Sequence, residues 1–298
     1  MRKPDFFIVG APKCGTTFLN DYLHAHPDIF MAKKEIHFFG SDLGIIQPPL
    51  SEEQYLAYFS EGAHSALLGE SSAWYLFSKR AAREIHAFNP RSKIIIMLRN
   101  PVDMIRSLHR QFIFDLDEHE PDFERAISLE GERRAGKKLP DSKNFNKLPS
   151  YIESATYAPQ LKSYLDVFGR EAVHIILFED IAENAHEVYS GALQFLGAPP
   201  FVPARFEAKN VGRDLKNLHL HRTIDRPSPA VKTIVRTLIP SKRSREKIAA
   251  FLYRRNIRYV AATPISEAME KKLAGIFEQD IREVEKLIGR NLQHWLPC

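Results

Sequence analysis

Four short, nearly continuous runs of apolar residues mark the first two thirds of the chain, and each has the length of a buried strand. They are Phe6–Gly10, Ala66–Gly69, Lys93–Leu98 and Val173–Phe178. Continuous rather than alternating apolar runs are typical of parallel strands that are covered on both faces of a sheet. The pattern therefore predicts an α/β protein with a mainly parallel central sheet.

The intervals between these runs carry the spacing of amphipathic helices. One apolar face follows the first run, one follows Pro101, one precedes the fourth run, and a long one spans 266–288. The first three faces consist of Phe18, Leu19, Tyr22 and Leu23; Val102, Ile105, Leu108 and Phe112; and Leu161, Tyr164, Leu165 and Phe168. Helices that alternate with buried strands predict three layers, with the sheet flanked by helices. A single domain over residues 1–298 is the simplest organisation.

Two stretches show neither the apolar runs of buried strands nor the spacing of amphipathic helices. Residues 115–149 are charged and contain scattered Gly and Pro, and residues 199–225 are also weakly patterned before a basic amphipathic region around Val231–Leu252. In a compact α/β domain, an irregular stretch of this length is more often an insertion near the ligand than a domain boundary. We expect 115–149 to lie on the acceptor side of a binding site.

The charge is distributed unevenly along the chain. The 298 residues carry a net charge of +5, but 205–258 holds 15 Lys and Arg against 4 Asp and Glu, so this segment is strongly basic and the remainder is acidic. A local basic excess indicates an anionic partner. A polyanionic cofactor, an acidic polysaccharide, anionic lipid and nucleic acid all remain open at this point.

Cysteine content and the N-terminus predict a cytoplasmic protein. Two cysteines, Cys14 and Cys298, are too few for a disulfide framework. The first strand begins within a few residues of Met1, which leaves no room for a signal peptide, and no apolar run is long enough to span a membrane.

The segment between the first strand and the first helix predicts an anion-binding turn. A strand ending at Gly10, a turn and a helix opening in Thr16 and Thr17 direct free backbone N–H groups and the positive helix end toward one point. Gly10 and Gly15 have the spacing of a nucleotide-triphosphate loop, yet Thr16 stands where that loop has its lysine, and Lys13 precedes Gly15. The turn therefore suits a phosphate-like group without a magnesium-bound γ-phosphate. A generic strand–turn–helix with chance glycine spacing is the alternative.

A second cation follows the third strand. Arg99 ends that strand, and ligands of open parallel sheets bind beyond the carboxyl ends of the strands, so Arg99 and Lys13 should lie on the same rim. Arginine can grip a phosphate in bidentate fashion. An ATP-dependent small-molecule kinase would instead have an acidic residue at a strand end and a lysine at the position of Thr16. That enzyme class is the first alternative function.

Four blocks in order make the chain resemble the sulfotransferases that use 3′-phosphoadenosine 5′-phosphosulfate (PAPS). The blocks are Ala11–Thr17, Lys34–Phe39, Gly69–Leu76, and Arg99 with Ser107. The second block, Lys-Glu-Ile-His-Phe-Phe, is similar to one found especially in carbohydrate and bacterial members. The sequence departs from glycan-modifying members at Gly40 and Ser71, where several carry Asp and Lys, and at Phe178, where many carry Tyr.

The resemblance implies a P-loop-like three-layer fold and a nucleotide site that requires no metal. PAPS would be the sulfuryl donor and adenosine 3′,5′-bisphosphate the product. The implied contacts to the 5′-phosphosulfate come from Lys13, Cys14, Gly15, Thr16 and Thr17, those to the 3′-phosphate from Arg99 and Ser107, and those of a closing loop from Lys209, Gly212 and Arg213.

The resemblance also places the catalytic chemistry. It implies in-line transfer of the sulfuryl group to an acceptor hydroxyl, with Lys13 stabilising the leaving group and Glu35 as general base. His37 would assist, or act as the base itself. On the residues alone, the preferred interpretation of Lys33, Lys34 and Glu35 is a solvated charge run, and that of His37 is a structural histidine.

The implied acceptor is a sugar hydroxyl of a glycan or glycolipid, or a small natural product, with no nucleic-acid partner. A protein of a different class, which binds nucleic acid or a membrane through the basic segment and retains only a vestigial loop, is the second alternative. The basic helix leaves open a peripheral contact with a membrane surface. The sequence does not indicate an oligomeric state.

Overall fold

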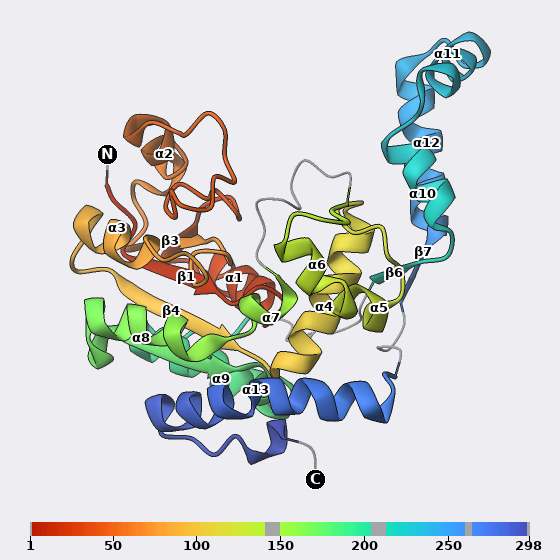
Figure 1. The fold of residues 1–298 in the computed structure, drawn as a ribbon. Coiled ribbons are helices and arrows are strands. Elements are labelled where there is room, and N and C mark those ends of the chain that lie inside the picture. The colour runs from red at the N-terminus through yellow and green to blue at the C-terminus, as the bar shows by residue number, and fades with distance from the viewer. Residues whose placement is uncertain (1, 141–149, 204–212, 260–263, 297–298) are drawn as a thin grey trace.

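A computed structural model describes residues 2–140, 150–203, 213–259 and 264–296. Its centre is a sheet of five parallel strands in the order β2-β3-β1-β4-β5 (Figure 1). The strands are β1 Phe6–Gly10, β2 Ile29–Met31, β3 Leu67–Ser71, β4 Lys93–Leu98 and β5 Val173–Leu177. The central strands β1 and β4 are almost entirely buried. The predicted α/β class and the parallel sheet are confirmed.

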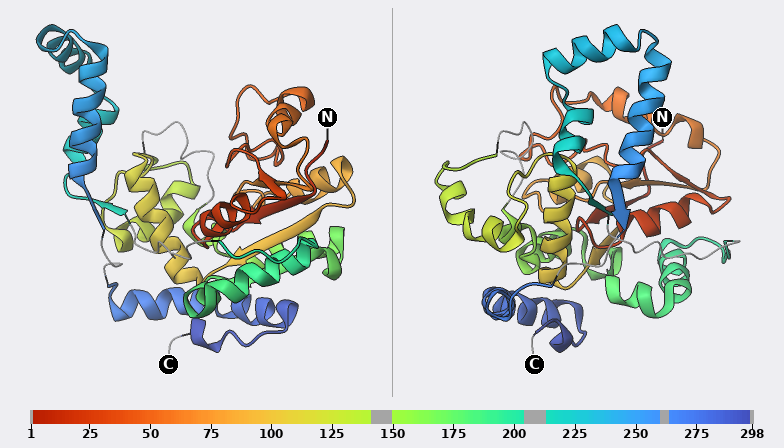
Figure 2. Two further views of the ribbon diagram at one scale, coloured as in Figure 1. Left: turned by 180° about the vertical axis from the view of Figure 1, so that it is seen from behind. Right: turned by 90° about the vertical axis from the view of Figure 1, so that its right-hand side faces the viewer.

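Helices form a layer on each face of this sheet. The helices α1 and α9 share one layer, where the rings of Tyr22 and Tyr189 lie 6.1 Å apart, and in the other layer α8 packs on both α3 and α13 (Figure 2). The helices are α1 Thr16–His24, α2 Glu52–Ala57, α3 Ala81–Phe88, α4 Pro101–Phe114, α5 Phe123–Ser128, α6 Glu130–Arg134, α7 Tyr151–Ser154, α8 Tyr157–Phe168, α9 Phe178–Leu196, α10 Leu218–Asp225, α11 Pro229–Leu238, α12 Lys242–Asn256 and α13 Glu267–Ile288. The three-layer prediction is therefore confirmed.

Several predicted bounds agree closely with the structure. The predicted strands 93–98 and 173–178 correspond to β4 and β5, and the predicted long helix 266–288 is α13, which Ser266 caps by accepting from the N–H of Met269. Pro101 occupies the first turn of α4, where its missing N–H costs nothing. The edge strand β2 was not predicted, because three residues between polar flanks give too short a pattern.

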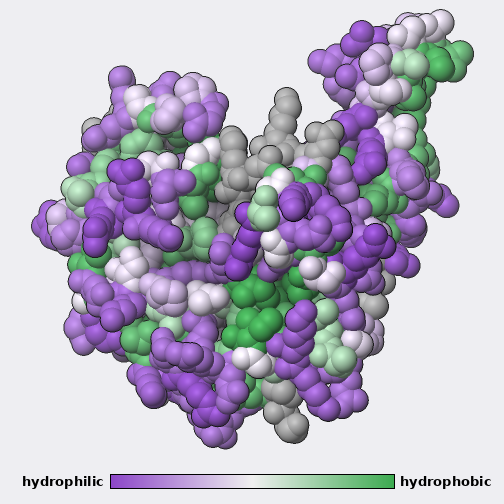
Figure 3. Space-filling view, viewed as in Figure 1, coloured by the Kyte–Doolittle hydropathy of each residue, from purple (hydrophilic) through white to green (hydrophobic). Residues whose placement is uncertain are grey.

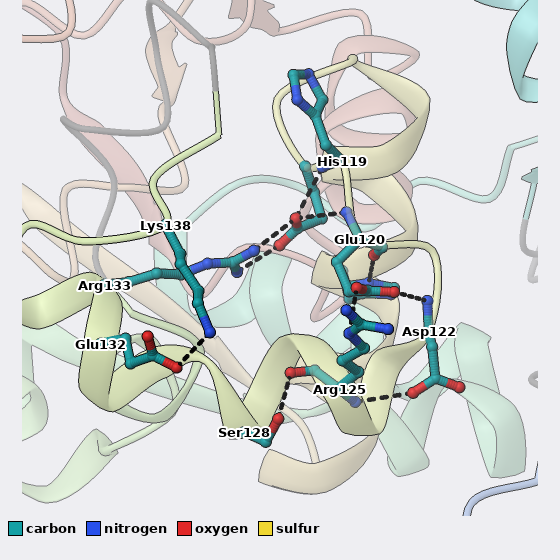
Figure 4. A network of polar contacts seen from close by, with 10 residues as sticks. His119, Glu120, Asp122, Arg125, Ser128, Glu132, Arg133 and Lys138 are labelled. Atoms are coloured by element: carbon teal, nitrogen blue, oxygen red, sulfur yellow. Dashed lines mark hydrogen bonds and ion pairs between the residues drawn. The ribbon is translucent and has the colours of Figure 1, made fainter.

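In residues 115–140, ion pairs and hydrogen bonds between charged side chains hold the segment in place (Figure 4). Arg133, on α6, donates to both oxygens of the buried Glu118 carboxylate at 2.7 and 2.9 Å, and the Tyr151 hydroxyl donates to the same group at 3.0 Å. Burial pushes the pKa of Glu118 upward, but the hydrogen bonds from Arg133 and the backbone outweigh it and hold the pKa below its usual value. Residues 115–140 thus contain the short helices α5 and α6 and are not an irregular loop, while 141–149 lie outside the described residues.

The basic segment forms an arm that projects from the body, at the upper right of Figure 1. Strands β6 (Arg213–Leu215) and β7 (Ile257–Tyr259) pair antiparallel at its base, and α10, α11 and α12 lie between them. The helix predicted around 231–252 is present as two helices, because Pro240 interrupts it and Ser241 caps a new helix, α12. No helix among the described residues has the length and apolar character needed to cross a bilayer.

Candidate functional site

Two glycines shape the turn between β1 and α1. Gly15, the N-cap of α1, has a φ of 90°, and a Cβ there would lie 2.9 Å from Cδ1 of Ile181 on α9. At Gly10 a Cβ would lie 2.5 Å from the Ala73 carbonyl oxygen. Both positions exclude a side chain, because neighbouring segments approach the backbone closely. The close approach places the N-terminus of α1 at the carboxyl edge of the sheet.

The first two residues of α1 face a lysine from the loop that follows β2. Lys34, three residues after β2, donates from Nζ to Oγ1 of Thr17 at 2.8 Å and lies 3.5 Å from Oγ1 of Thr16. Burial lowers the pKa of Lys34, and the nearby carboxylates of Glu35 and Asp21 oppose this shift. An ammonium, two hydroxyls and the end of a helix dipole thus meet at one point, which is a donor set for an anion. We call Lys34, Thr16 and Thr17 the cradle cluster.

The sequence pattern does not assign Lys34 to the nucleotide site. Lys34 is the first residue of the block Lys34–Phe39, and nothing in the local pattern shows that its side chain reaches α1. The signal that could have pointed to it is positional: it follows a strand that ends at the same edge as β1.

Lys13 extends toward α4 on the other side of the turn. Its backbone has a positive φ of 64°, and Nζ donates to Oε1 of Gln111 at 3.0 Å. The amide of Gln111 in turn donates to both carboxylate oxygens of Asp115, at 2.8 and 2.9 Å. Burial raises the pKa of Asp115, and Gln111 and Lys13 oppose that shift. Gln111 and Asp115 are therefore supports of Lys13 that were not predicted.

Arg99 lies directly beyond β4, as predicted. Its guanidinium lies 4.3 Å from the centre of the Phe178 ring and 4.0 Å from the carboxylate of Asp103. The side chain is partly exposed, at 21%. The ring face of Phe178 thus contacts Arg99. Many members of the family that the sequence resembles carry Tyr at this position.

One stripe of α4 connects the two cations. Asp103, Ser107 and Gln111 are spaced by four residues and therefore share a face of the helix, with Asp103 near Arg99 and Gln111 bonded to Lys13. Ser107 is half-buried and lies between them along this stripe. The structure thus brings Ser107, Arg99 and Lys13 to one region of the molecule.

Cys14 differs from the other predicted residues of the turn. Its thiol is fully buried, 3.4 Å from the Pro12 carbonyl oxygen and 3.8 Å from the Tyr157 hydroxyl, and its backbone N–H donates to the Ala11 carbonyl. Burial raises the pKa of Cys14 to about 12. A thiol with such a pKa is a poor nucleophile at neutral pH. The Cys14 side chain packs inside the turn, and the nucleotide contact implied for this residue stays a prediction.

Glu35 and His37 form a close pair beside the cradle cluster. Their backbones have positive φ values of 59° and 54°, a conformation that non-glycine residues rarely adopt. Two hydrogen bonds from backbone N–H groups stabilise this conformation. The Glu35 N–H donates to the Ser71 carbonyl at 2.8 Å, and the His37 N–H donates to the Ser72 hydroxyl oxygen at 3.2 Å. Glu35 and His37 are thereby fixed to the end of β3.

The side chains of this pair leave one carboxylate oxygen available. Oε2 of Glu35 accepts from the Ala73 N–H at 3.1 Å and lies 3.1 Å from Nε2 of His37, whereas neither contact uses Oε1. The Glu35 side chain is 39% exposed and that of His37 is 10% exposed. The Nδ1 atom of His37 is buried without a hydrogen-bond partner. Glu35 therefore meets solvent at the site, while His37 stands behind it.

A buried carboxylate supports this pair from below. Glu70 on β3 is fully buried and accepts hydrogen bonds from the hydroxyls of Ser72 (2.8 Å), Tyr75 (2.7 Å) and Tyr55. Burial raises the pKa of Glu70, and the three hydroxyls oppose the shift. Because Ser72 also accepts from the His37 backbone, this network ties the His37 loop to the core.

A cavity of about 530 Å³ opens next to Lys34 along the edge strand β2. Its lining comes from α1, β2 and the α2 region and includes Asn20, His24, Phe30, Lys33, Lys34 and Tyr58. The lining mixes charged groups, from Lys33, Lys34 and Glu61, with apolar ones such as Phe30 and Met31. Figure 3 shows hydrophilic side chains over much of the face viewed there.

The predicted closing loop is mostly outside the described residues. Lys209 and Gly212 lie there, and Arg213 begins β6, although the placement of its side chain is not described. Their nucleotide contacts remain predictions.

Comparison with known proteins gives consistent likenesses. The family model described as "Sulfotransferase domain" matches residues 3–227. Carbohydrate sulfotransferase 15 of Mus musculus is 28% identical over 250 residues, covering 66% of this chain and 44% of that protein. Heparan sulfate glucosamine 3-O-sulfotransferase 6 of Homo sapiens is 34% identical over 105 residues, covering 34% of this chain and 28% of that protein. The chain thus spans less than half the length of these curated relatives.

Similarity to one crystal structure extends over the whole chain. A sulfotransferase from Alicyclobacillus acidocaldarius has a TM-score of 0.71 and 29% sequence identity, and the match covers 99% of both chains. The arrangement of layers is therefore shared by a solved protein of comparable extent.

Proposed function

Because this chain belongs to the sulfotransferase domain family, we propose that it transfers a sulfuryl group from PAPS to the hydroxyl of a glycan or of another polar small molecule. PAPS is the general donor of that family. The observation that carries the proposal is the convergence of Lys34, Thr16 and Thr17 at the start of α1, with Glu35 beside them.

The donor set of the site fits the two anionic ends of PAPS. The cradle cluster and the N-terminus of α1 offer an ammonium, hydroxyls and a helix dipole for the 5′-phosphosulfate. Arg99 and Ser107, on the neighbouring strand end and helix, suit the 3′-phosphate. PAPS supplies an activated sulfuryl group that leaves from its 5′-phosphate.

The protein's own residues would position the reactants and handle charge. As the acceptor oxygen bonds to sulfur, the bond between sulfur and the phosphate oxygen breaks, so negative charge builds up on that oxygen. Lys13 neutralises this charge, and Oε1 of Glu35 takes the proton of the acceptor hydroxyl. No covalent enzyme intermediate is needed, and Cys14, with its raised pKa, plays no part in the transfer.

The geometry favours Glu35 over His37 as the base. Nε2 of His37 is directed at Glu35, and Nδ1 is buried, so neither nitrogen is open to an incoming acceptor. Glu35 is exposed and keeps Oε1 outside both of its contacts. We therefore assign His37 the role of orienting the Glu35 carboxylate.

The ligand preference separates this proposal from the two alternatives. The protein should bind adenosine 3′,5′-bisphosphate without magnesium and bind ATP with magnesium far more weakly, as measured by isothermal calorimetry. Tighter binding of magnesium ATP would overturn the proposal in favour of a kinase. Failure to bind either nucleotide would overturn it in favour of a protein with a vestigial loop. Screening glycans and small phenols or alcohols with radiolabelled PAPS then identifies the acceptor.

Replacement of Arg99 should affect only ligands with a 3′-phosphate. We expect Arg99→Ala to raise the Kd for adenosine 3′,5′-bisphosphate about tenfold or more, because a charge-assisted hydrogen bond contributes on the order of 1.5–3 kcal/mol. The Kd for adenosine 5′-phosphate should stay within about twofold. Arg83→Ala, at an exposed arginine of α3, is the matched control. Equal losses for both nucleotides would contradict the assignment.

Lys34 offers a test of the cradle cluster. Lys34→Ala should weaken adenosine 3′,5′-bisphosphate about tenfold, because it removes the ammonium that contacts both threonine hydroxyls. The adjacent Lys33 is exposed, and Lys33→Ala should change the Kd less than about twofold. Equal effects of the two variants would mean that Lys34 acts only through the general charge of the loop.

A further inference from the structure

The arm formed by residues 218–256 has few contacts with the body. Its attachment lies at one end, where the rings of His221 and Tyr253 pack against Phe114 on α4. There Nε2 of His221 lies 2.8 Å from the Phe114 carbonyl oxygen, and Arg226 lies 3.8 Å from Asp117. Beyond this attachment, α11 has no buried residue and α12 buries only Asn256. The outer half of the arm therefore presents its side chains to the surroundings on nearly all sides (Figures 1 and 2).

Large apolar side chains are exposed on this outer half. Leu238 is 75% exposed, and Ile234, one helical turn before it on the same face of α11, is 57% exposed. On α12, Phe251 is 57% exposed and Ile248, three residues before it, is 44% exposed. Figure 3 shows hydrophobic side chains among hydrophilic ones toward the outer end of the arm. Each helix thus exposes a pair of large apolar side chains at helical spacing, which indicates an interaction surface, because exposed apolar residues are ordinarily isolated.

The same helices carry a large excess of positive charge. Residues 218–256 contain ten Lys and Arg and two Asp and Glu. Most of the basic side chains are exposed, among them Lys232, Arg236, Lys247 and Arg254. Among the described residues, the ion pair of the outer arm joins Lys242 to Glu246 within α12 itself, so it leaves the net positive charge of the arm unchanged.

A partner of the outer arm has to match both its basic side chains and its exposed apolar side chains. Nucleic acid complements the basic residues but gives four large apolar side chains nothing to bury against. A second copy of this chain complements the apolar face, but a symmetric contact would bring two basic arms together, and like charges repel. An anionic lipid surface satisfies both requirements, because it accepts apolar side chains at the headgroup boundary and attracts Lys and Arg beside them.

We propose that the outer arm, α11 and α12, is a docking surface for membranes rich in anionic lipid, with Ile234, Leu238, Ile248 and Phe251 entering the interface and the surrounding Lys and Arg side chains holding the headgroups. The contact is peripheral. It does not depend on the sulfotransferase function, because it uses none of the residues of the nucleotide site.

The test is co-sedimentation of the full chain with vesicles, without any sulfuryl donor. Binding is expected to vesicles of equal parts phosphatidylcholine and phosphatidylglycerol, to weaken as sodium chloride is raised, and to be at least about tenfold weaker with phosphatidylcholine alone. The double variant Leu238→Ser/Phe251→Ser and the double variant Arg236→Glu/Lys247→Glu should each lower partitioning about tenfold or more. Both remove groups that are exposed in the folded chain, so folding should be retained.

Matched controls lie on α13, away from the arm. Ile276→Ser replaces an apolar side chain that is 44% exposed, and Lys272→Glu/Lys286→Glu reverses two exposed charges. These variants should bind vesicles like the unchanged protein, and every variant should retain its circular dichroism and its Kd for adenosine 3′,5′-bisphosphate. Lack of binding to anionic vesicles, or equal losses in the arm and α13 variants, would overturn the proposal. A dimer seen by light scattering and abolished by Leu238→Ser/Phe251→Ser, without vesicle binding, would assign the arm to a second copy instead.

Discussion

Glu35→Gln should lower kcat by about 10²–10⁴ while leaving the Kd for adenosine 3′,5′-bisphosphate within about twofold, because a positioned general base contributes on this order to proton transfer. Glutamine is nearly isosteric, and its amide oxygen can still accept from the Ala73 N–H, which preserves the loop. The variant therefore removes the proton acceptor and little else. Transfer to the acceptor found by screening, measured with radiolabelled PAPS, gives kcat, and calorimetry gives the Kd.

The matched control is Glu171→Gln, at an exposed glutamate distant in sequence from the site blocks, which should keep full activity. His37→Gln should reduce kcat less than Glu35→Gln, because His37 acts by holding Oε2 of Glu35 in place. Near-normal turnover of Glu35→Gln together with a large loss in His37→Gln would reverse the two roles. That outcome would leave the donor site as proposed, since the two side chains lie beside the cradle cluster and not within it.

Hydrophobic patterning predicted the parts of the fold that are buried on both sides. The strands β1, β4 and β5 are short, apolar and flanked by amphipathic helices, so burial and periodicity give the same answer. The turn after β1 could be predicted equally well, because glycine spacing and helix-capping chemistry are local properties of the chain. The predicted rim position of Arg99 followed from the parallel sheet alone and agrees with its place beyond β4.

Two of the differences between prediction and structure arose where a distant partner determines the structure. Residues 115–140 have an irregular, charged sequence because their order rests on Glu118 and Arg133, which neutralise each other inside the molecule across 15 positions. Likewise, a lysine at 34 reads as a surface charge until β2 is placed next to β3. The helix predicted around 231–252 is divided in two for a local reason, since Pro240 and Ser241 end one helix and begin the next.

One face of α4 connects site residues that come from different sequence blocks. Arg99 contacts Asp103, Lys13 bonds to Gln111, and Ser107 lies between these two partners on the same face. A rigid helix thus fixes the separation of the cation assigned to the 3′-phosphate from the cation assigned to the leaving group. Such support on a regular element is what precise positioning of reactants requires.

Lys13→Ala should lower kcat by about 10²–10³, because a preorganised charge directed at a developing oxyanion contributes on this order in a site with restricted water. The Kd for adenosine 3′,5′-bisphosphate should rise less than about tenfold, since the cradle cluster, Arg99 and Ser107 remain. The backbone at Lys13 has a positive φ of 64°, which alanine tolerates about as poorly as lysine, so the substitution changes the side chain without relaxing the turn.

Three comparisons make the result for Lys13 specific to its charge. Lys13→Met keeps the aliphatic stem and should lose as much kcat as Lys13→Ala, whereas Lys13→Arg keeps the charge and should lose less, although its broader fork cannot reproduce the contact of Nζ with Gln111. Lys79→Ala, at an exposed lysine outside the site, should have no effect. If Lys13→Ala weakened nucleotide binding and kcat/KM equally and left kcat intact, Lys13 would stabilise the bound donor and the transition state alike, and the leaving-group role would pass to Lys34, the other lysine beside the N-terminus of α1.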